Sequence, residues 1–148
     1  MGQLNLPDFA RIYIDTVVLI YVVEQAPVYG SLLAALWTKL QAGNLEVFTS
    51  ELIVMETLVI PIRNSDTFLI DAYEQLLRSP QIQLIPVNQN ILREAARLRA
   101  VTPSLRTPDA IHVATAMTSE CSQFLTNDRR LRIMPDLPVV ILDELLTS

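Results

Sequence analysis

The chain has 148 residues, 51% of them hydrophobic and 18% charged, which predicts a single globular domain over residues 1–148 and excludes a disordered chain. The net charge of −5 excludes a non-specific nucleic-acid coat, and the single cysteine excludes an internal disulfide and a cysteine-based zinc site. Because no apolar run is long enough to span a bilayer and the N-terminus lacks a signal-peptide pattern, we expect a cytoplasmic protein without a membrane partner.

The first strand and helix are predicted in the most apolar run of the chain. Residues 11–14 are β-branched and aromatic, which indicates a strand. A strand that continued to residue 23 would be about 43 Å long at roughly 3.3 Å per residue, beyond a typical strand. We therefore predict that the strand ends at Asp15 and that a short apolar helix follows it.

Beyond this run, apolar residues at helical spacing alternate with short strands. Gly43 suits the C-terminal end of a helix. Ser50, Asn88 and Thr107 suit the position before a helix. In chain order, the predicted elements are a helix over 28–42, a strand over 45–49, helices over 50–63 and 65–78, a strand over 82–87, helices over 88–100 and 107–120, and strands over 124–126 and 139–142. This alternation predicts an α/β domain with a mostly parallel sheet.

Four carboxylates stand where strands or helices meet apolar runs, namely Asp15, Glu56, Asp109 and Asp128. A desolvated carboxylate without a cationic partner costs several kcal/mol, on the order of a domain's stability margin. An oxygen-rich cluster of this kind suits Mg²⁺ or Mn²⁺ and would repel itself without a cation. Open α/β sheets place their sites at the carboxyl ends of strands, where Asp15 and Asp128 fall. We therefore predict a shared metal site.

Each acid taken singly also has a structural interpretation. Asp15 can cap the following helix, and Asp128 can turn the chain after a strand. Asp109 lies in a first helical turn, where the helix dipole favours negative charge. Glu56 is different, because it lies inside a helix among apolar residues, where a side chain that faces a site is the better interpretation.

The residues around the acids have two interpretations each. His112 shares a helix face with Asp109 and either packs in the core or contacts substrate and transfers a proton. Arg106, Arg129 and Arg130 flank two of the acids and either hold phosphates or form solvated ion pairs.

Metal and acids without a serine or cysteine nucleophile motif indicate water attack on a phosphodiester bond. Competing motifs are missing: Val17 breaks the Asp-x-Asp of haloacid-dehalogenase phosphatases, and Lys39 is the only lysine and too early for a receiver domain. With three glycines, a phosphate-cradling loop is excluded.

Residues 12–16, 50–56, 107–112 and 125–128, in this order, resemble PIN-domain ribonucleases, specifically the VapC-type toxins of bacterial toxin–antitoxin pairs. The similarity extends over about residues 11–143. It implies a three-layer α/β/α sandwich with a mostly parallel sheet, in agreement with the alternation of strands and helices.

The resemblance implies a Mg²⁺- or Mn²⁺-dependent endoribonuclease. Its substrate would be tRNA or structured rRNA, its partner a small cognate antitoxin, and its assembly a homodimer. The four acids would hold the metal directly or through water. Thr16 and Thr126 would supply supporting hydroxyls, and Asn127 would orient Asp128 or touch substrate.

The chain departs from the family pattern at Val17, where family members often have an asparagine two residues after the first aspartate. The alternative hypothesis is therefore a catalytically weakened PIN-like module that binds RNA or a protein partner without cleaving. Because all four acids are present, we expect activity to survive.

Overall fold

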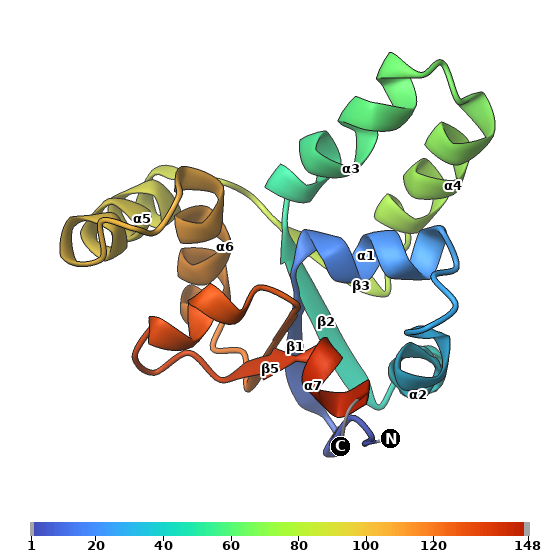
Figure 1. Ribbon diagram of the computed structural model, residues 1–148, viewed down its shortest axis with the longest axis horizontal. Coiled ribbons are helices and arrows are strands. Elements are labelled where there is room, and N and C mark those ends of the chain that lie inside the picture. Colours follow the sequence, from blue (N-terminus) through green and yellow to red (C-terminus); the bar gives the residue numbers. More distant parts are fainter. Residues whose placement is uncertain (1, 147–148) are drawn as a thin grey trace.

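The structure is a computed structural model that describes residues 2–146 (Figure 1). Within these residues, a five-stranded sheet has the order β3-β2-β1-β4-β5, and every neighbouring pair is parallel. The strands are β1 (Ala10–Ile14), β2 (Leu45–Ser50), β3 (Ile82–Ile85), β4 (Gln123–Thr126) and β5 (Val139–Ile141). The predicted α/β fold with a mostly parallel sheet is confirmed, and all the pairings are parallel.

The helices fall at the predicted places, with two additions near the C-terminus. They are α1 (Thr16–Val23), α2 (Gly30–Gln41), α3 (Leu52–Arg63), α4 (Thr67–Leu77), α5 (Gln89–Val101), α6 (Thr107–Thr118), the 3-10 helix η1 (Arg129–Ile133) and α7 (Leu142–Leu146). The last two were not predicted, because five residues are too few to show helical periodicity. Across residues 2–146, no helix has the length and hydrophobicity needed to cross a bilayer.

The predicted cap of α6 is wrong by one residue. Arg106 precedes the helix in an extended conformation, and Thr107 is its first residue. The backbone N–H of Arg106 donates to the Asp109 carboxylate, with 3.3 Å between nitrogen and Oδ2. Thr107 instead accepts a hydrogen bond at its hydroxyl from Arg99 of α5. The capping hydrogen bond at this end of the helix therefore comes from a carboxylate three residues after Arg106 and not from the threonine.

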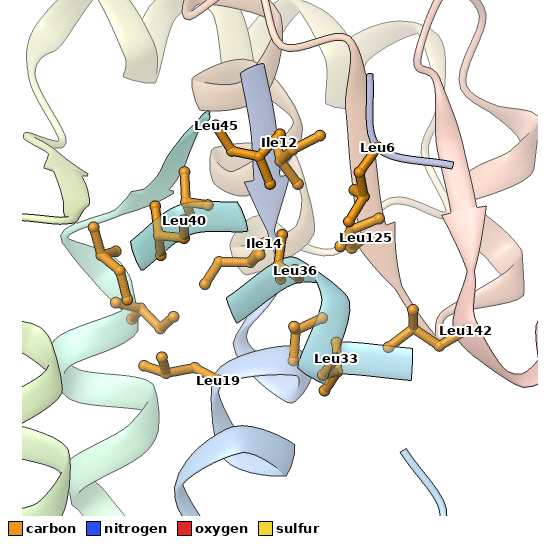
Figure 2. Packing of buried hydrophobic residues seen from close by; sticks show 14 of the residues in the cluster. Leu6, Ile12, Ile14, Leu19, Leu33, Leu36, Leu40, Leu45, Leu125 and Leu142 are labelled. Carbon is orange, nitrogen blue, oxygen red and sulfur yellow. The ribbon is translucent and has the colours of Figure 1, made fainter. Parts of the chain in front are cut away.

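Side chains of β1 alternate between two hydrophobic clusters, one on each face of the sheet. Ile12 and Ile14 pack with leucines of α1 and α2 (Figure 2). Tyr13 points to the opposite face, where it packs with residues of α5 and α6. Figure 1 shows the same arrangement, with α1 to α4 on one side of the sheet and α5 and α6 on the other. The result is a three-layer sandwich in which β1 is buried on both faces.

The sheet changes direction at β1. From β1 the chain builds outward through β2 and β3, and it then returns to the other side of β1 as β4 and β5. In open α/β sheets, such a reversal leaves a crevice beyond the carboxyl ends of the two central strands. Here β1 ends next to Asp15 and β4 ends at Thr126. The topology thus brings the first and last predicted acids together at the carboxyl ends of the central strands.

Candidate active site

A cavity of about 500 Å³ opens at the carboxyl ends of β1 and β4. All four predicted acids line it, although they come from four different parts of the fold. The lining residues are Asp15, Thr16, Val17 and Ile20 at the start of the chain, Glu56 of α3, Arg106, Asp109 and His112 at α6, and Thr126, Asn127 and Asp128 after β4. The four predicted acids thus converge on one cavity in the structure.

The start of α1 and the end of β4 hold the Asp15 carboxylate. One carboxylate oxygen accepts from the backbone N–H of Thr16 at 2.8 Å, which caps α1. The other accepts from the Thr126 hydroxyl at 2.6 Å. The same hydroxyl oxygen accepts from the backbone N–H of Asp128 at 3.0 Å. Thr126 therefore links two acids that are 113 residues apart in the chain (128 minus 15).

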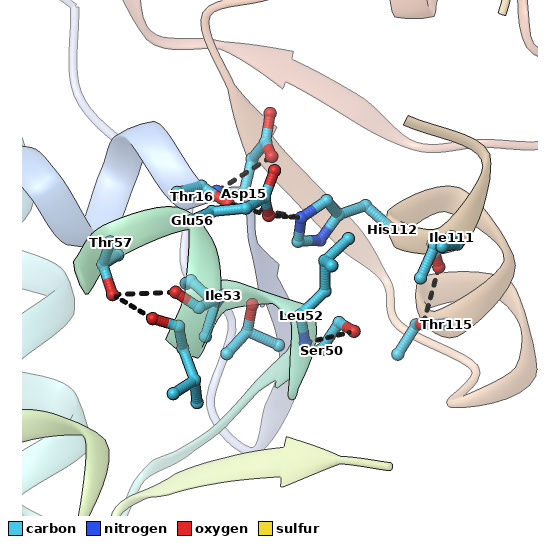
Figure 3. A network of polar contacts seen from close by, with 12 residues as sticks. Asp15, Thr16, Ser50, Leu52, Ile53, Glu56, Thr57, Ile111, His112 and Thr115 are labelled. Carbon is cyan, nitrogen blue, oxygen red and sulfur yellow. Dashed lines mark hydrogen bonds and ion pairs between the residues drawn. The ribbon is translucent and has the colours of Figure 1, made fainter. Parts of the chain in front are cut away.

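Glu56 projects into the cavity from α3. The hydroxyl of Ser50 accepts from the Leu52 N–H at 3.1 Å and supports the start of this helix (Figure 3). The Glu56 Oε1 atom accepts from the Thr16 hydroxyl at 2.8 Å and lies 2.6 Å from His112 Nε2. Partial burial raises the pKa of Glu56, but the hydrogen bond and charge of His112, with the Thr16 hydrogen bond, leave that pKa below its ordinary value.

His112 is buried, with 3% of its surface exposed, and it is also part of the site. Its Nε2 atom faces Glu56 and its Nδ1 atom lies 2.6 Å from the hydroxyl of Tyr13. Sequence reasoning missed Tyr13. The available signal was a phenol at a central position of a strand buried on both faces, where a hydroxyl needs a partner. Burial raises the pKa of Tyr13 well above its ordinary value.

Arginines hold the other two acids. Arg130 donates to Asp128 through two atoms, with Nε 2.9 Å from Oδ1 and Nη2 2.6 Å from Oδ2. Its Nη2 atom also lies 3.7 Å from Asp109 Oδ2, and Arg106 Nε donates to that same oxygen at 3.0 Å. The positive charge that the acids require is therefore partly supplied by the chain itself. The sequence argument for a metal, which started from the cost of unpaired acids, underestimated the arginines.

Two of the predicted supporting residues have other partners. The amide of Asn127 donates to the Tyr21 hydroxyl at 2.8 Å and accepts from the Asp143 N–H at 2.8 Å, so it ties α1 to α7. Arg129 lies 3.9 Å from Glu144 and does not line the cavity. Asn127 still borders the cavity, but its polar atoms are directed to the scaffold.

Comparison with known proteins agrees with this architecture. Residues 12–137 match the family model of the PIN domain. The chain belongs to the PIN domain family. A sequence comparison with curated proteins finds no match.

Solved structures show the same PIN fold at low sequence identity. VapBC2 from Rickettsia felis, bound to a DNA fragment from its promoter, is 13% identical, with a TM-score of 0.72 over 88% of this chain and 98% of that one. FitAcB from Neisseria gonorrhoeae is 19% identical, with a TM-score of 0.68 over 90% and 99%. A toxin–antitoxin complex from Klebsiella pneumoniae is 21% identical, with a TM-score of 0.65 over 88% and 97%. The predicted three-layer sandwich is confirmed.

The donor atoms of this PIN domain suit a hard divalent cation. The cavity offers carboxylate and hydroxyl oxygens, which are the ligands of Mg²⁺ and Mn²⁺. Over residues 2–146, no three acidic, histidine or cysteine side chains are grouped closely enough to hold an ion as they lie. Asp109 and Asp128 are instead directed to Arg106 and Arg130. The residue types fit the cation, and the arginines compete with it for the same oxygens.

The Asp128–Arg130 ion pair should make the stability of the fold depend on pH. The Arg130 hydrogen bond, opposed by partial burial and aided by the charges of Arg130 and Arg106, holds the pKa of Asp128 below its ordinary value. The pair therefore stabilises the fold above the unfolded-state pKa, about 3.9, and its contribution is lost as the pH falls below that value. We expect Arg130→Gln to raise the pKa of Asp128, measured by NMR titration of the carboxyl carbon.

Arg129→Gln is the matched control for this titration. It removes one positive charge from the neighbouring position, but Arg129 pairs with Glu144 and not with Asp128. The pKa of Asp128 is expected to stay low in this variant. An equal rise in both variants would mean that general charge, and not the two-atom contact with Arg130, sets the pKa.

Proposed function

We propose that this PIN domain is a Mg²⁺- or Mn²⁺-dependent endoribonuclease of the VapC type, the toxin of a toxin–antitoxin pair. The observation that carries the proposal is the convergence of Asp15, Glu56, Asp109 and Asp128 on one cavity of about 500 Å³. Capping and turns account for three of the acids taken singly but not for Glu56 inside α3. They also do not explain why all four acids meet at the reversal point of the sheet. A shared cation explains this convergence.

In this proposal the four carboxylates hold the metal, directly or through water. A divalent cation held there supplies positive charge opposite the scissile phosphate and makes water a better nucleophile. Thr16 and Thr126 hold the carboxylates of Glu56 and Asp15 through their hydroxyls. Arg106 lines the cavity and keeps 65% of its side-chain surface exposed. Arg130, which contacts Asp128 and lies near Asp109, keeps 57% exposed. A phosphodiester near these acids can accept hydrogen bonds from both guanidinium groups.

The expected partners are tRNA or structured rRNA as substrate, a small cognate antitoxin, and a second copy of the chain. The solved relatives named above include toxin–antitoxin complexes, which supports an antitoxin partner. Met55, Ile60 and Phe68 of α3 and α4 expose 63%, 58% and 85% of their surface. An apolar surface of this kind suits a protein partner or a dimer contact. The cytoplasm is the compartment in which we expect this activity.

The proposal is tested with purified protein and total RNA. We expect new RNA ends at defined sites when Mg²⁺ or Mn²⁺ is present and none when EDTA is added, with sequencing of the ends to identify the substrate. Metal should also raise the melting temperature, because it binds only the folded chain. Cleavage that continues unchanged in EDTA would contradict the proposal.

One observation favours the alternative of a PIN-like module that binds without cleaving. Val17 lines the cavity with an apolar side chain where many family members have asparagine. The same experiment distinguishes the two functions. A melting temperature raised by metal, with retention of RNA and no new ends, would favour the binding module.

A further inference from the structure

Two buried side chains, Tyr13 and His112, connect the middle of the sheet to Glu56. The hydroxyl of Tyr13 lies 2.6 Å from His112 Nδ1, and His112 Nε2 lies 2.6 Å from Glu56 Oε1 (Figure 3 shows the second contact). Tyr13 is fully buried and does not line the cavity. It comes from β1, whereas His112 comes from α6 and Glu56 from α3. Three layers of the fold therefore meet in these two contacts.

When the imidazole of His112 is neutral, the chemistry of the Glu56 carboxylate sets the direction of both hydrogen bonds. An ionised carboxylate only accepts, so His112 must carry its proton on Nε2 to bond Glu56. A neutral imidazole then has a lone pair on Nδ1, and the Tyr13 hydroxyl donates to it. Both hydrogen bonds thus point toward the Glu56 carboxylate. Thr16 adds a second donor to the same oxygen at 2.8 Å.

Packing holds the Tyr13 side chain rigidly. The ring of Tyr13 stacks on Phe124, with 4.9 Å between centroids and 14° between planes. It meets the His112 ring edge-on at 5.9 Å and 74°. Because interiors are close-packed, the phenol cannot turn away without displacing Phe124. Its hydroxyl is a fixed donor that selects one tautomer and one orientation of the imidazole.

We propose that Tyr13 and His112 are positioning residues that orient the Glu56 carboxylate for a divalent cation. The inference rests on the proposed function for the identity of the ligand, but the hydrogen-bond direction can be tested without metal. Partners that orient a metal-binding side chain from behind commonly change metal affinity by about 10–100-fold. Tyr13 acts through His112, so its removal should fall at the lower end of this range.

The test compares two tyrosines that share the same chemistry. Tyr73 is 1% exposed and donates its hydroxyl to Glu24 at 2.5 Å, in the core cluster on the other side of the sheet. Tyr13→Phe and Tyr73→Phe each remove one buried hydroxyl. We expect Tyr13→Phe to weaken Mn²⁺ binding about 10-fold, measured by calorimetry, and Tyr73→Phe to leave it within about 2-fold of wild type.

Two changes at His112 separate positioning from packing. His112→Ala should weaken Mn²⁺ binding by up to about 100-fold. His112→Gln retains an N–H donor that can reach Glu56, so it should recover part of this loss. Equal affinities in the alanine and glutamine variants would overturn the positioning role.

NMR spectroscopy can measure directly which ring nitrogen of His112 carries the proton. His112 is the only histidine of the chain, so its two ring nitrogens give the only imidazole signals in a ¹⁵N spectrum. At pH 8, without metal, we expect the proton on Nε2 and an unprotonated, hydrogen-bonded Nδ1 whose signal shifts in Tyr13→Phe. A proton on Nδ1 in the wild type would overturn the inference.

The outcomes separate this inference from the proposed function. If wild type binds Mn²⁺ and Tyr13→Phe binds it as tightly as Tyr73→Phe does, the positioning role is wrong and the ribonuclease proposal stands. If wild type binds no Mn²⁺ and cleaves no RNA, the proposed function and the positioning role both fail. The tautomer of His112 then still tests the hydrogen-bond direction alone.

Discussion

Replacement of Asp15 by asparagine is expected to lower metal-dependent RNA cleavage by at least about 100-fold. The loss of a residue that only supports a metal-binding side chain already costs about 10–100-fold, and in our proposal Asp15 binds the metal itself. Asparagine has nearly the same shape, and its carbonyl can still accept from the Thr16 N–H that caps α1. The fold should therefore persist while the negative charge is lost.

Asp8→Asn is the control for this experiment. Asp8 is also an aspartate, but 70% of its side chain is exposed and it pairs with Lys39 outside the cavity. Both proteins should be purified in parallel and assayed for RNA ends with Mg²⁺ or Mn²⁺, after circular dichroism has established that each is folded. Wild-type cleavage by Asp15→Asn, or an equal loss in both variants, would remove Asp15 from the proposed site.

Phe124→Ala is expected to lower the free energy of unfolding by about 3–5 kcal/mol, the usual range for a truncated buried phenylalanine. Phe124 is fully buried in β4 and stacks on Tyr13, behind the site. The free energy of unfolding of a domain is only about 5–15 kcal/mol, so this single change removes a large part of it. Urea unfolding followed by circular dichroism measures the difference.

The matched change is Phe68→Ala in α4, where 85% of the ring is exposed. It deletes the same atoms, but those atoms are already in water, so the free energy of unfolding should change by less than about 0.5 kcal/mol. Similar losses in the two variants would contradict the assignment of Phe124 to the core. A folded Phe124→Ala protein should also bind Mn²⁺ more weakly, because Tyr13 loses its support.

Local interactions explain why most elements could be predicted. Asn88 accepts from the Ile91 N–H at the start of α5, as its residue type indicates. β1 ends at Ile14, as predicted, and Asp15 caps α1 directly after it. These effects act between residues within four positions of each other. The predictions failed at η1 and α7, which are too short to carry such a pattern, and at Thr107, where Asp109 caps the helix instead.

The site was only partly accessible from the sequence. The four acids were recognisable because each is costly among apolar neighbours. Their counter-charges were not, since nothing local indicates that Arg130 turns back to Asp128 while also lying near Asp109. Arg129, one residue earlier, has the same chemistry and instead faces Glu144. The turn into η1 makes this difference.

The sequence was sufficient for the α/β class and for singling out the four acids that the structure brings to one cavity, because periodicity, caps and the cost of an embedded charge are local properties. The partners of those acids required the folded chain. Tyr13 and His112 are 99 residues apart, and His112 and Glu56 are 56 apart. A hydrogen bond over such distances depends on the sheet order and on which face each side chain takes. Those two features decide the surroundings of His112, which is buried in the core and also contacts the Glu56 carboxylate.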